Sequence, residues 1–207
     1  MPREERRRRL LAGAQELFGT QGYRSTEVDQ IARLAGVTKP MLYRHFPGGK
    51  AEIFLAVLEE HINTLLRSLW EAMASSSEPR KRLRNGLRAY LEFAEEDTAG
   101  FNLLIASSGE LDPAVGRRLR EVRESIASGL ANTIADVMRG AGLQAEGAPL
   151  YAYAMLGAVE SVTSWWLTLS DRPGRDQIVD YLLAFLWRGF DGLPRMPGRH
   201  HGQRPPG

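Results

Sequence analysis

The stretch GYRSTEVDQIARLAGVTKPMLYRHF, residues 22–46, contains two short helical patterns separated by a turn. The first pattern is a run of apolar residues spaced to share one helix face: Val28, Ile31, Ala32 and Ala35. Thr26 followed three residues later by Asp29 resembles a capping box, and Gly36 is the residue type that commonly ends helices. The pattern therefore predicts a helix of about ten residues, capped by Thr26 and ended by Gly36.

A second helix is predicted directly after Gly36. Thr38 has the side chain of an N-cap, and Pro40 falls in the first turn, where the amide that it lacks has no intrahelical partner. This helix is expected to run to about Phe46. Two short helices joined by a turn that contains glycine are typical of a helix-turn-helix, whose second helix enters the DNA major groove.

The flat and cationic side chains of this second helix suit a nucleic-acid partner. Lys39 and Pro40 lie at its N-terminal end, where recognition helices meet base edges, and Tyr43 lies one turn further on. Tyr43, His45 and Lys50 are residue types that donate hydrogen bonds or charge to phosphates, which fixes the register of a docked helix. For His45 the alternative is a structural role at a helix C-terminus.

The charge distribution favours the same kind of partner. Residues 1–50 contain ten Lys and Arg and five Asp and Glu, a balance of +5, whereas the remaining 17 basic and 20 acidic residues give −3. A basic end on a mildly acidic remainder is expected where one end of a molecule meets a polyanion. The run of arginines at positions 6–9 contributes to this balance, although such runs are more often solvated helix faces.

Almost all of the remaining chain also has a helical pattern. Apolar residues from Leu10 to Phe18 predict a first helix over about residues 4–21, ended by Gly22. Residues 52–74 predict a helix roughly 36 Å long, at 1.5 Å per residue. Further helices are expected around residues 83–94, from Asp112-Pro113 onward, over residues 150–169 and over residues 178–190.

These patterns predict an all-α protein with two domains. A three-helix, helix-turn-helix DNA-binding domain over residues 1–50 is followed by a larger helical regulatory and dimerisation domain over residues 51–191. Residues 192–207 are rich in Pro and Gly and are expected to form a disordered tail.

The last two predicted helices are apolar around most of their circumference. A membrane span is the alternative for residues 150–169, but Glu160 lies in the middle of that segment. We therefore predict no membrane and a homodimer, in which each helix packs on its own core on one side and on a second copy on the other. The expected apolar anchors of that interface are Trp166, Leu183 and Trp187.

Composition excludes several kinds of chemistry. The absence of cysteine excludes disulfides, thiolate zinc sites and cysteine nucleophiles, and the four histidines leave little room for a metal site, so neither metal nor cofactor is expected. No basic segment followed by an apolar one marks the N-terminus, so we expect a cytoplasmic protein. His61 lacks the Glu three residues earlier that carboxylate-bridged metal pairs use, which leaves an all-helical enzyme as a remote alternative.

The stretch 22–46 strongly resembles the DNA-binding segment of tetracycline-repressor (TetR) family regulators, and the resemblance extends over about residues 5–58. It rests on the spacing of Gly-Tyr, Thr, Ile-Ala, Ala-Gly-Val-Thr and Leu-Tyr-x-His-Phe. By this resemblance, the following residues match positions at the DNA: Thr26, Thr38, Lys39, Pro40, Tyr43 and His45. Lys50 stands four residues after Phe46, whereas the family usually places its basic residue three positions on.

The resemblance further implies a dimeric regulator, most often a repressor, that leaves a palindromic operator when its body binds a small molecule. We expect the effector site between the helix at 52–74 and the helices that follow, with a mostly apolar lining. The candidate lining residues, each of which could instead be plain core, are His61, Leu65, Tyr90, Phe93, Phe101, Met155 and Trp166. Glu160 is expected either to pair across the dimer or to meet a polar ligand group. A constitutive DNA-binding regulator without a ligand is the alternative.

Overall fold

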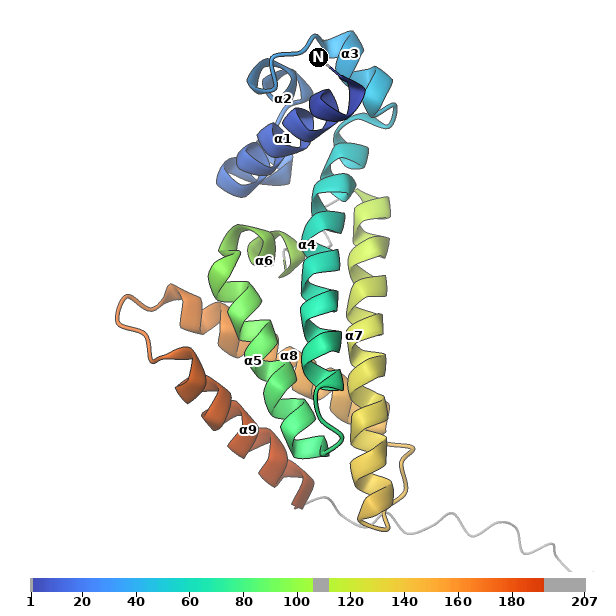
Figure 1. Cartoon of the computed structure of the whole chain (residues 1–207), viewed down its shortest axis with the longest axis vertical. Coiled ribbons are helices and arrows are strands. Elements are labelled where there is room, and N and C mark those ends of the chain that lie inside the picture. The colour runs from blue at the N-terminus through green and yellow to red at the C-terminus, as the bar shows by residue number, and fades with distance from the viewer. Residues whose placement is uncertain (1, 106–111, 192–207) are drawn as a thin grey trace, which may run out of the picture.

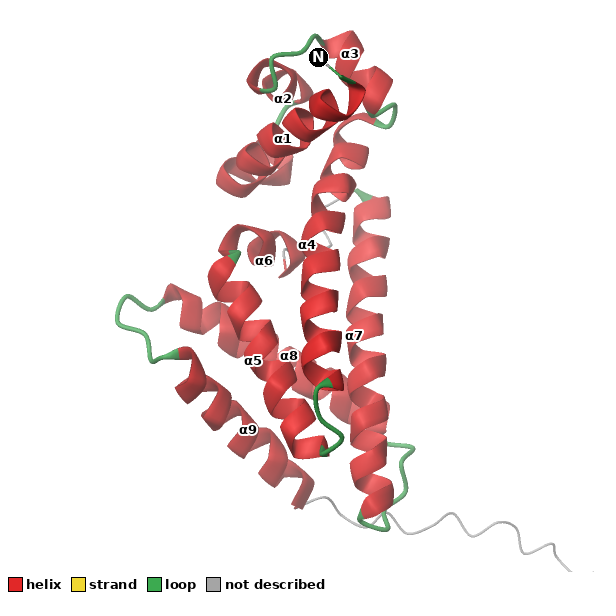
Figure 2. Cartoon of the chain, viewed as in Figure 1, coloured by secondary structure: helices red, strands yellow, loops and turns green. Residues whose placement is uncertain are grey.

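The structure, a computed structural model, describes residues 2–105 and 112–191 (Figure 1). All regular structure in these two ranges is helical (Figure 2), which confirms the predicted all-α class. The helices are α1 (Arg3–Ser25), α2 (Val28–Leu34), α3 (Lys39–His45), α4 (Gly49–Ala74), α5 (Pro79–Glu96), α6 (Thr98–Ile105), α7 (Pro113–Gly140), α8 (Ala148–Thr168) and α9 (Arg175–Asp191). The tail predicted over residues 192–207 lies outside the described ranges.

The first three helices form a small head at one end of the molecule (Figure 1). The predicted break at Gly22 is present, because this residue has φ 79° and ψ 170°, but the chain resumes helical conformation and α1 ends only at Ser25. Gly36, at φ +66°, makes the turn between α2 and α3, a conformation that glycine adopts without a steric cost. The structure thus contains the predicted helix-turn-helix.

The predicted capping box of α2 is wrong by one residue. Glu27, not Thr26, is the N-cap, and it exchanges hydrogen bonds with Gln30, so α2 has seven residues. The Thr26 hydroxyl is engaged elsewhere, since it donates to the carbonyl oxygen of Gly22 at 2.8 Å. Thr26 therefore closes the kink at the end of α1 rather than capping α2.

Helix α4 connects the head to the body. It starts at Gly49, three residues before the predicted start, and continues for 26 residues (Figure 1). Ile53 and Phe54 near its start are buried in the core of the head, whereas Leu65 and Leu69 near its end are buried in the core of the body. Because one helix belongs to both cores, the domain boundary at residue 50 stays a prediction.

Helix α6 was not predicted from the sequence. Asp97 ends α5, and its Oδ1 accepts a hydrogen bond from the Gly100 amide at 3.0 Å, which starts the next helix after a sharp change of direction. Eight residues are too few for a periodic apolar pattern to stand out. The start of α7 is as predicted, since the Asp112 side chain accepts a hydrogen bond from the Ala114 amide at 2.8 Å.

The last two helices pack on the body along one side only. The predicted interface anchors are wrong for Trp166 and Leu183, because both side chains are buried in the chain's own core, as is much of Trp187. Five of the eight large apolar side chains that are exposed in the described residues lie on α8 and α9: Leu150, Tyr153, Trp165, Tyr181 and Phe185. No helix in the described ranges is both long and apolar enough to span a membrane.

Candidate functional site

Helix α3 presents one exposed face that combines cationic and flat side chains. Lys39, Pro40, Tyr43 and Arg44 are all exposed, and at 100° per residue they fall within an arc of roughly 140°. Leu42 points the other way and is fully buried in the core of the head. The apolar side of α3 thus fixes the orientation of its polar side, and Thr38 lies exposed at the start of this face.

The two cationic side chains on this face, Lys39 and Arg44, differ in their interactions with the rest of the protein. The Lys39 Nζ lies 2.8 Å from Asp29 Oδ1 of α2, and this hydrogen bond with the nearby carboxylate raises the pKa of Lys39. Arg44 has no ion pair or hydrogen bond with any residue of the described ranges. Arg44 is not among the residues predicted from the sequence, although its position next to Tyr43 on a seven-residue helix is a signal that could have identified it.

His45 is half-buried at the end of α3, beside the first turns of α1. Burial lowers the pKa of His45, and the positive charges of Arg3, Arg6 and Arg7 lower it further. The imidazole is therefore mainly neutral at pH 7. Its contact with a DNA phosphate stays a prediction.

Two of the predicted DNA contacts are turned inward. Thr26 is fully buried, and Lys50 donates from Nζ to the Arg24 carbonyl oxygen at 3.0 Å. The same ammonium lies 4.6 Å from the centre of the Tyr23 ring, and burial lowers the pKa of Lys50. In the free protein these two residues stabilise the head, and their contacts with DNA stay predictions.

The arginine run at the start of α1 serves partly structural purposes. The Arg7 guanidinium lies 4.6 Å from the centre of the buried Phe46 ring. Arg8 and Arg9 pair with Glu5 along the helix, at 3.4 and 3.1 Å. Exposed pairs of this kind contribute about 0.3–0.5 kcal/mol each.

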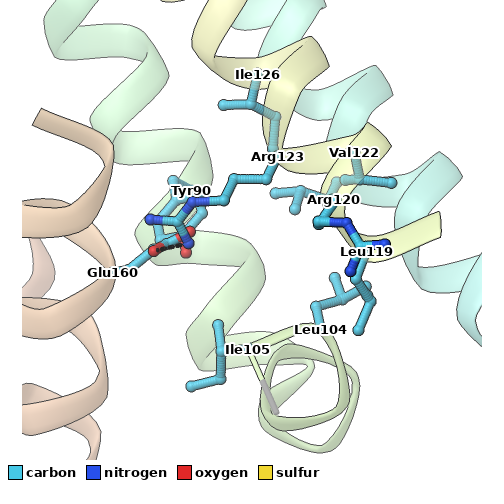
Figure 3. A pocket seen from close by; sticks show the side chains of 10 residues that line it. Tyr90, Leu104, Ile105, Leu119, Arg120, Val122, Arg123, Ile126 and Glu160 are labelled. Atoms are coloured by element: carbon cyan, nitrogen blue, oxygen red, sulfur yellow. Dashed lines mark hydrogen bonds and ion pairs between the residues drawn. The ribbon is translucent and has the colours of Figure 1, made fainter. Parts of the chain in front are cut away.

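A cavity of about 250 Å³ lies in the body where five helices meet (Figure 3). Its lining residues come from α4 (Leu65), α5 (Tyr90), α6 (Leu104, Ile105), α7 (Leu119, Arg120, Val122, Arg123, Ile126) and α8 (Glu160). Leu65 and Tyr90 were predicted to line an effector site, and both are here.

An ion pair crosses this cavity. Arg123 extends from α7 to Glu160 on α8, with 2.5 Å between Nη1 and Oε2, and Tyr90 lies beside the pair (Figure 3). Burial raises the pKa of Glu160, while Arg123 opposes that rise. Burial, followed by the charge of Glu160, also raises the pKa of Tyr90. Glu160 thus pairs with Arg123 of its own chain, whereas the sequence led us to expect a partner across the dimer or on a ligand.

A smaller cavity of about 60 Å³ adjoins the first, since Tyr90 and Ile126 line both. The side chains around it are apolar and include Leu69, Trp70, Leu87 and Met155. Its one charged lining residue is Arg82, which lies 3.8 Å from Asp136. Met155, the third predicted lining residue, is therefore at a cavity as well.

The other four predicted lining residues line neither cavity. Phe93 and Phe101 are buried in the core of the body. Trp166 is fully buried, and its Nε1 donates to the Pro173 carbonyl oxygen at 2.8 Å. His61 is buried at the junction of α4 and α6, where its Nδ1 lies 2.5 Å from Asp97 Oδ2. Helical spacing placed these residues inward correctly but did not identify their neighbours.

An exposed basic recognition helix on a helix-turn-helix head, joined to a helical body with a cavity, is the architecture of a DNA-binding regulator. The profile "Bacterial regulatory proteins, tetR family" matches residues 10–57, and the profile "Tetracyclin repressor-like, C-terminal domain" matches residues 79–189. The chain belongs to the TetR family of DNA-binding transcriptional regulators. This family is not enzymatic, so the alternative of a helical enzyme is wrong.

Known relatives extend over nearly the whole chain. The HTH-type transcriptional activator FasR of Mycolicibacterium smegmatis is 33% identical over 195 residues, which cover 94% of this chain and 87% of FasR. A TetR-like regulator from Rhodococcus sp. RHA1 superposes with a TM-score of 0.76 at 25% identity, covering 93% and 100% of the two chains. AibR, solved with isovaleryl coenzyme A and operator DNA, shares the fold at a TM-score of 0.73 and 18% identity, covering 87% of this chain and 97% of AibR.

Proposed function

We propose that this regulator binds a palindromic operator as a homodimer in the cytoplasm and leaves it when a small, largely apolar molecule occupies the body cavity. The proposal rests on one observation: two helices, α4 and α6, line the cavity and also pack against the head. Helix α4 contributes Leu65 to the cavity and Ile53 to the core of the head. Helix α6 contributes Leu104 and Ile105 to the cavity, while Leu103 belongs to the apolar cluster that extends from the head along α4 to α6 and α7.

A ligand in the cavity therefore touches the elements that position the recognition helix. A change in the tilt of α4 alters the distance between the two heads of a dimer, which must match half-sites about 34–36 Å apart. Coupling requires that the ligand prefer the shape that does not fit DNA. A tenfold loss of DNA affinity corresponds to about 1.4 kcal/mol of such preference.

The direction of regulation follows from the position of the operator. Release raises transcription where the bound protein blocks the polymerase, and lowers it where the bound protein recruits the polymerase. The family resemblance favours repression, whereas FasR, at 33% identity, is named an activator. A reporter fused to the regulated promoter, with and without the gene for this chain, measures the sign.

The exposed face of α3 is tested by gel shift on the chain's own promoter region. Lys39→Ala and Arg44→Ala are expected to weaken binding across operator sequences. Each removes one cation from both protomers, so the salt slope of log K for the dimer should fall by about two. Tyr43→Phe should weaken binding by the loss of one hydroxyl. The matched control is Arg139→Ala, which removes an exposed arginine at the end of α7 far from the head (Figure 1).

The ligand response is tested by combining thermal unfolding with gel shift over a library of apolar compounds. A ligand that binds the folded state raises the melting midpoint, and an effector must also lower DNA affinity. Compounds that raise the midpoint while every one leaves DNA affinity unchanged would identify a constitutive regulator. The absence of any salt-sensitive, sequence-preferring complex would overturn the DNA-binding assignment of α3.

A further inference from the structure

Among the described residues, the lining of the larger cavity carries one positive charge that no carboxylate opposes. Its charged lining residues are Arg120, Arg123 and Glu160. Arg123 pairs with Glu160, whereas Arg120 has no ion pair or hydrogen bond with any other part of the described chain. Figure 3 shows Arg120 across the opening from the ion pair, beside Leu119 and Leu104. Two arginines one turn apart on α7 thus line the cavity, and only Arg123 contacts the carboxylate.

The smaller cavity provides the opposite chemistry. It shares Tyr90 and Ile126 with the first cavity, and its walls are formed mainly by aliphatic side chains, Trp70 and methionines. Its one cation, Arg82, lies beside Asp136. The two cavities together offer a cationic end near the surface and an apolar end between α4, α5, α7 and α8.

This inference rests on the proposed function and names the ligand class: we infer that the two cavities bind an oxyanion carried on an unbranched apolar chain. The anion lies between Arg120 and Arg123, and the chain extends past Tyr90 into the smaller cavity. Guanidiniums suit this role because their planar donors match the oxygens of carboxylate, sulfonate or phosphate groups.

Glu160 then acts as the internal counter-ion of Arg123 while no ligand is bound. A ligand oxyanion competes with the Glu160 carboxylate for the same guanidinium, so Glu160 weakens the binding of anions and sets their threshold concentration. Glu160 also allows an anionic ligand to be distinguished from a cationic one, because a cationic ligand would be attracted by Glu160 and repelled by the two arginines.

The test uses three probes that share a ten-carbon chain: decane-1-sulfonate, decan-1-ol and decyltrimethylammonium. Binding to the full-length protein is measured by isothermal titration calorimetry below the concentrations at which the probes form micelles. The sulfonate is expected to bind most tightly. Shorter sulfonates are expected to lose about fourfold in affinity for each methylene removed from the buried chain.

Variants assign the binding to the named residues. Arg123→Gln is expected to weaken sulfonate binding about tenfold, and Arg120→Gln is expected to weaken it as well. Glu160→Gln is expected to tighten it. The double variant Arg123→Gln with Glu160→Gln avoids leaving a half-buried carboxylate unpaired and should bind the sulfonate more weakly than Glu160→Gln alone. Arg117→Gln, an exposed arginine on α7 outside the cavity lining, is the matched control and should bind like the wild type.

Each remaining outcome overturns the inference. Tighter binding of the ammonium probe would assign recognition to Glu160. Sulfonate affinity equal in the wild type and both arginine variants, or no binding of any ten-carbon probe, would remove the anion site. Gel shifts with the same probes separate this inference from the proposed function. If an alcohol or ammonium probe releases DNA, the proposed ligand response is supported even though the anion site is refuted. If the sulfonate binds as expected but does not release DNA, the anion site is supported and the ligand response is refuted.

Discussion

His45 links the protonation of one side chain to DNA binding. Its pKa is lowered in the free protein by burial and by three arginines, so the imidazole is mainly neutral at pH 7. A phosphate at His45 would favour the charged form, so the complex would bind more protons than the free protein. We therefore expect DNA affinity, measured at constant ionic strength, to rise as pH falls from about 8 to 6. His45→Gln should flatten this dependence, and an unchanged slope in that variant would assign the proton to another group.

Glu160 makes the folding stability of the protein depend on pH. Its pKa is raised above the ordinary 4.5 by burial, so the folded protein retains a proton that the unfolded chain has already lost. Stability therefore falls as pH rises from the ordinary value through the raised one, and stays lower above it. Urea unfolding should show Glu160→Gln equal to the wild type in acid and more stable than it at neutral pH. A difference that is independent of pH would contradict the raised pKa.

At the scale of elements, α6 depends on a close contact with α4. Asp97 caps α6 through Oδ1 and contacts His61 of α4 through Oδ2. A Cβ added to Gly100 would collide with both His61 Nδ1 and Asp97 Oδ2. Gly100→Ala is therefore expected to destabilise the protein by about 1–3 kcal/mol in urea unfolding.

The control for this variant is Gly140→Ala at the end of α7, where an added Cβ meets open space. It should be neutral or stabilising by up to about 1 kcal/mol, since alanine favours the helix. Equal effects of the two substitutions would show that the contact between α4 and α6 contributes nothing measurable. A ligand that reaches Leu104 and Ile105 acts on the same helix, so Gly100→Ala should also change the coupling between ligand and DNA.

At the scale of the whole molecule, the exposed side chains of α8 and α9 predict the homodimer interface. Phe185 is 70% exposed and Tyr181 62% exposed, one turn apart on α9, whereas Leu183 between them is 5% exposed. Small residues along α8, including Ala154 and Ser161, are exposed beside Trp165 and allow close approach of a second helix.

We expect light scattering of the wild type to give about twice 23.1 kDa. Tyr181→Glu with Phe185→Glu should yield a folded monomer, because these charges fall on the surface that a partner would cover. Leu183→Arg should instead unfold the chain, since it introduces a charge into its own core. Circular dichroism separates the two outcomes, and a wild-type monomer would refute the dimer.

The local signals of this chain were enough to predict its helices and its helix-turn-helix. Helical spacing, Gly22 and Gly36, and the pair Asp112-Pro113 act within a few residues of themselves, so they can be read without the fold. The same is true of the inward face of α3, which the position of Leu42 determines. The family resemblance in residues 22–46 added the DNA-binding function, which the matching family profile confirms.

Only the tertiary structure decided which buried residues surround a cavity and which exposed ones can meet a partner. Spacing shows that Trp166 and Leu65 face inward, but the packing of five helices leaves space beside Leu65 and none beside Trp166. The spacing of Thr26 and Asp29 predicted a helix cap, but the Thr26 hydroxyl instead donates to the carbonyl oxygen of Gly22 at the kink. Arg123 and Glu160 are 37 residues apart and meet because α7 and α8 pack together. Such contacts depend on where whole helices lie, which no pattern within one helix determines.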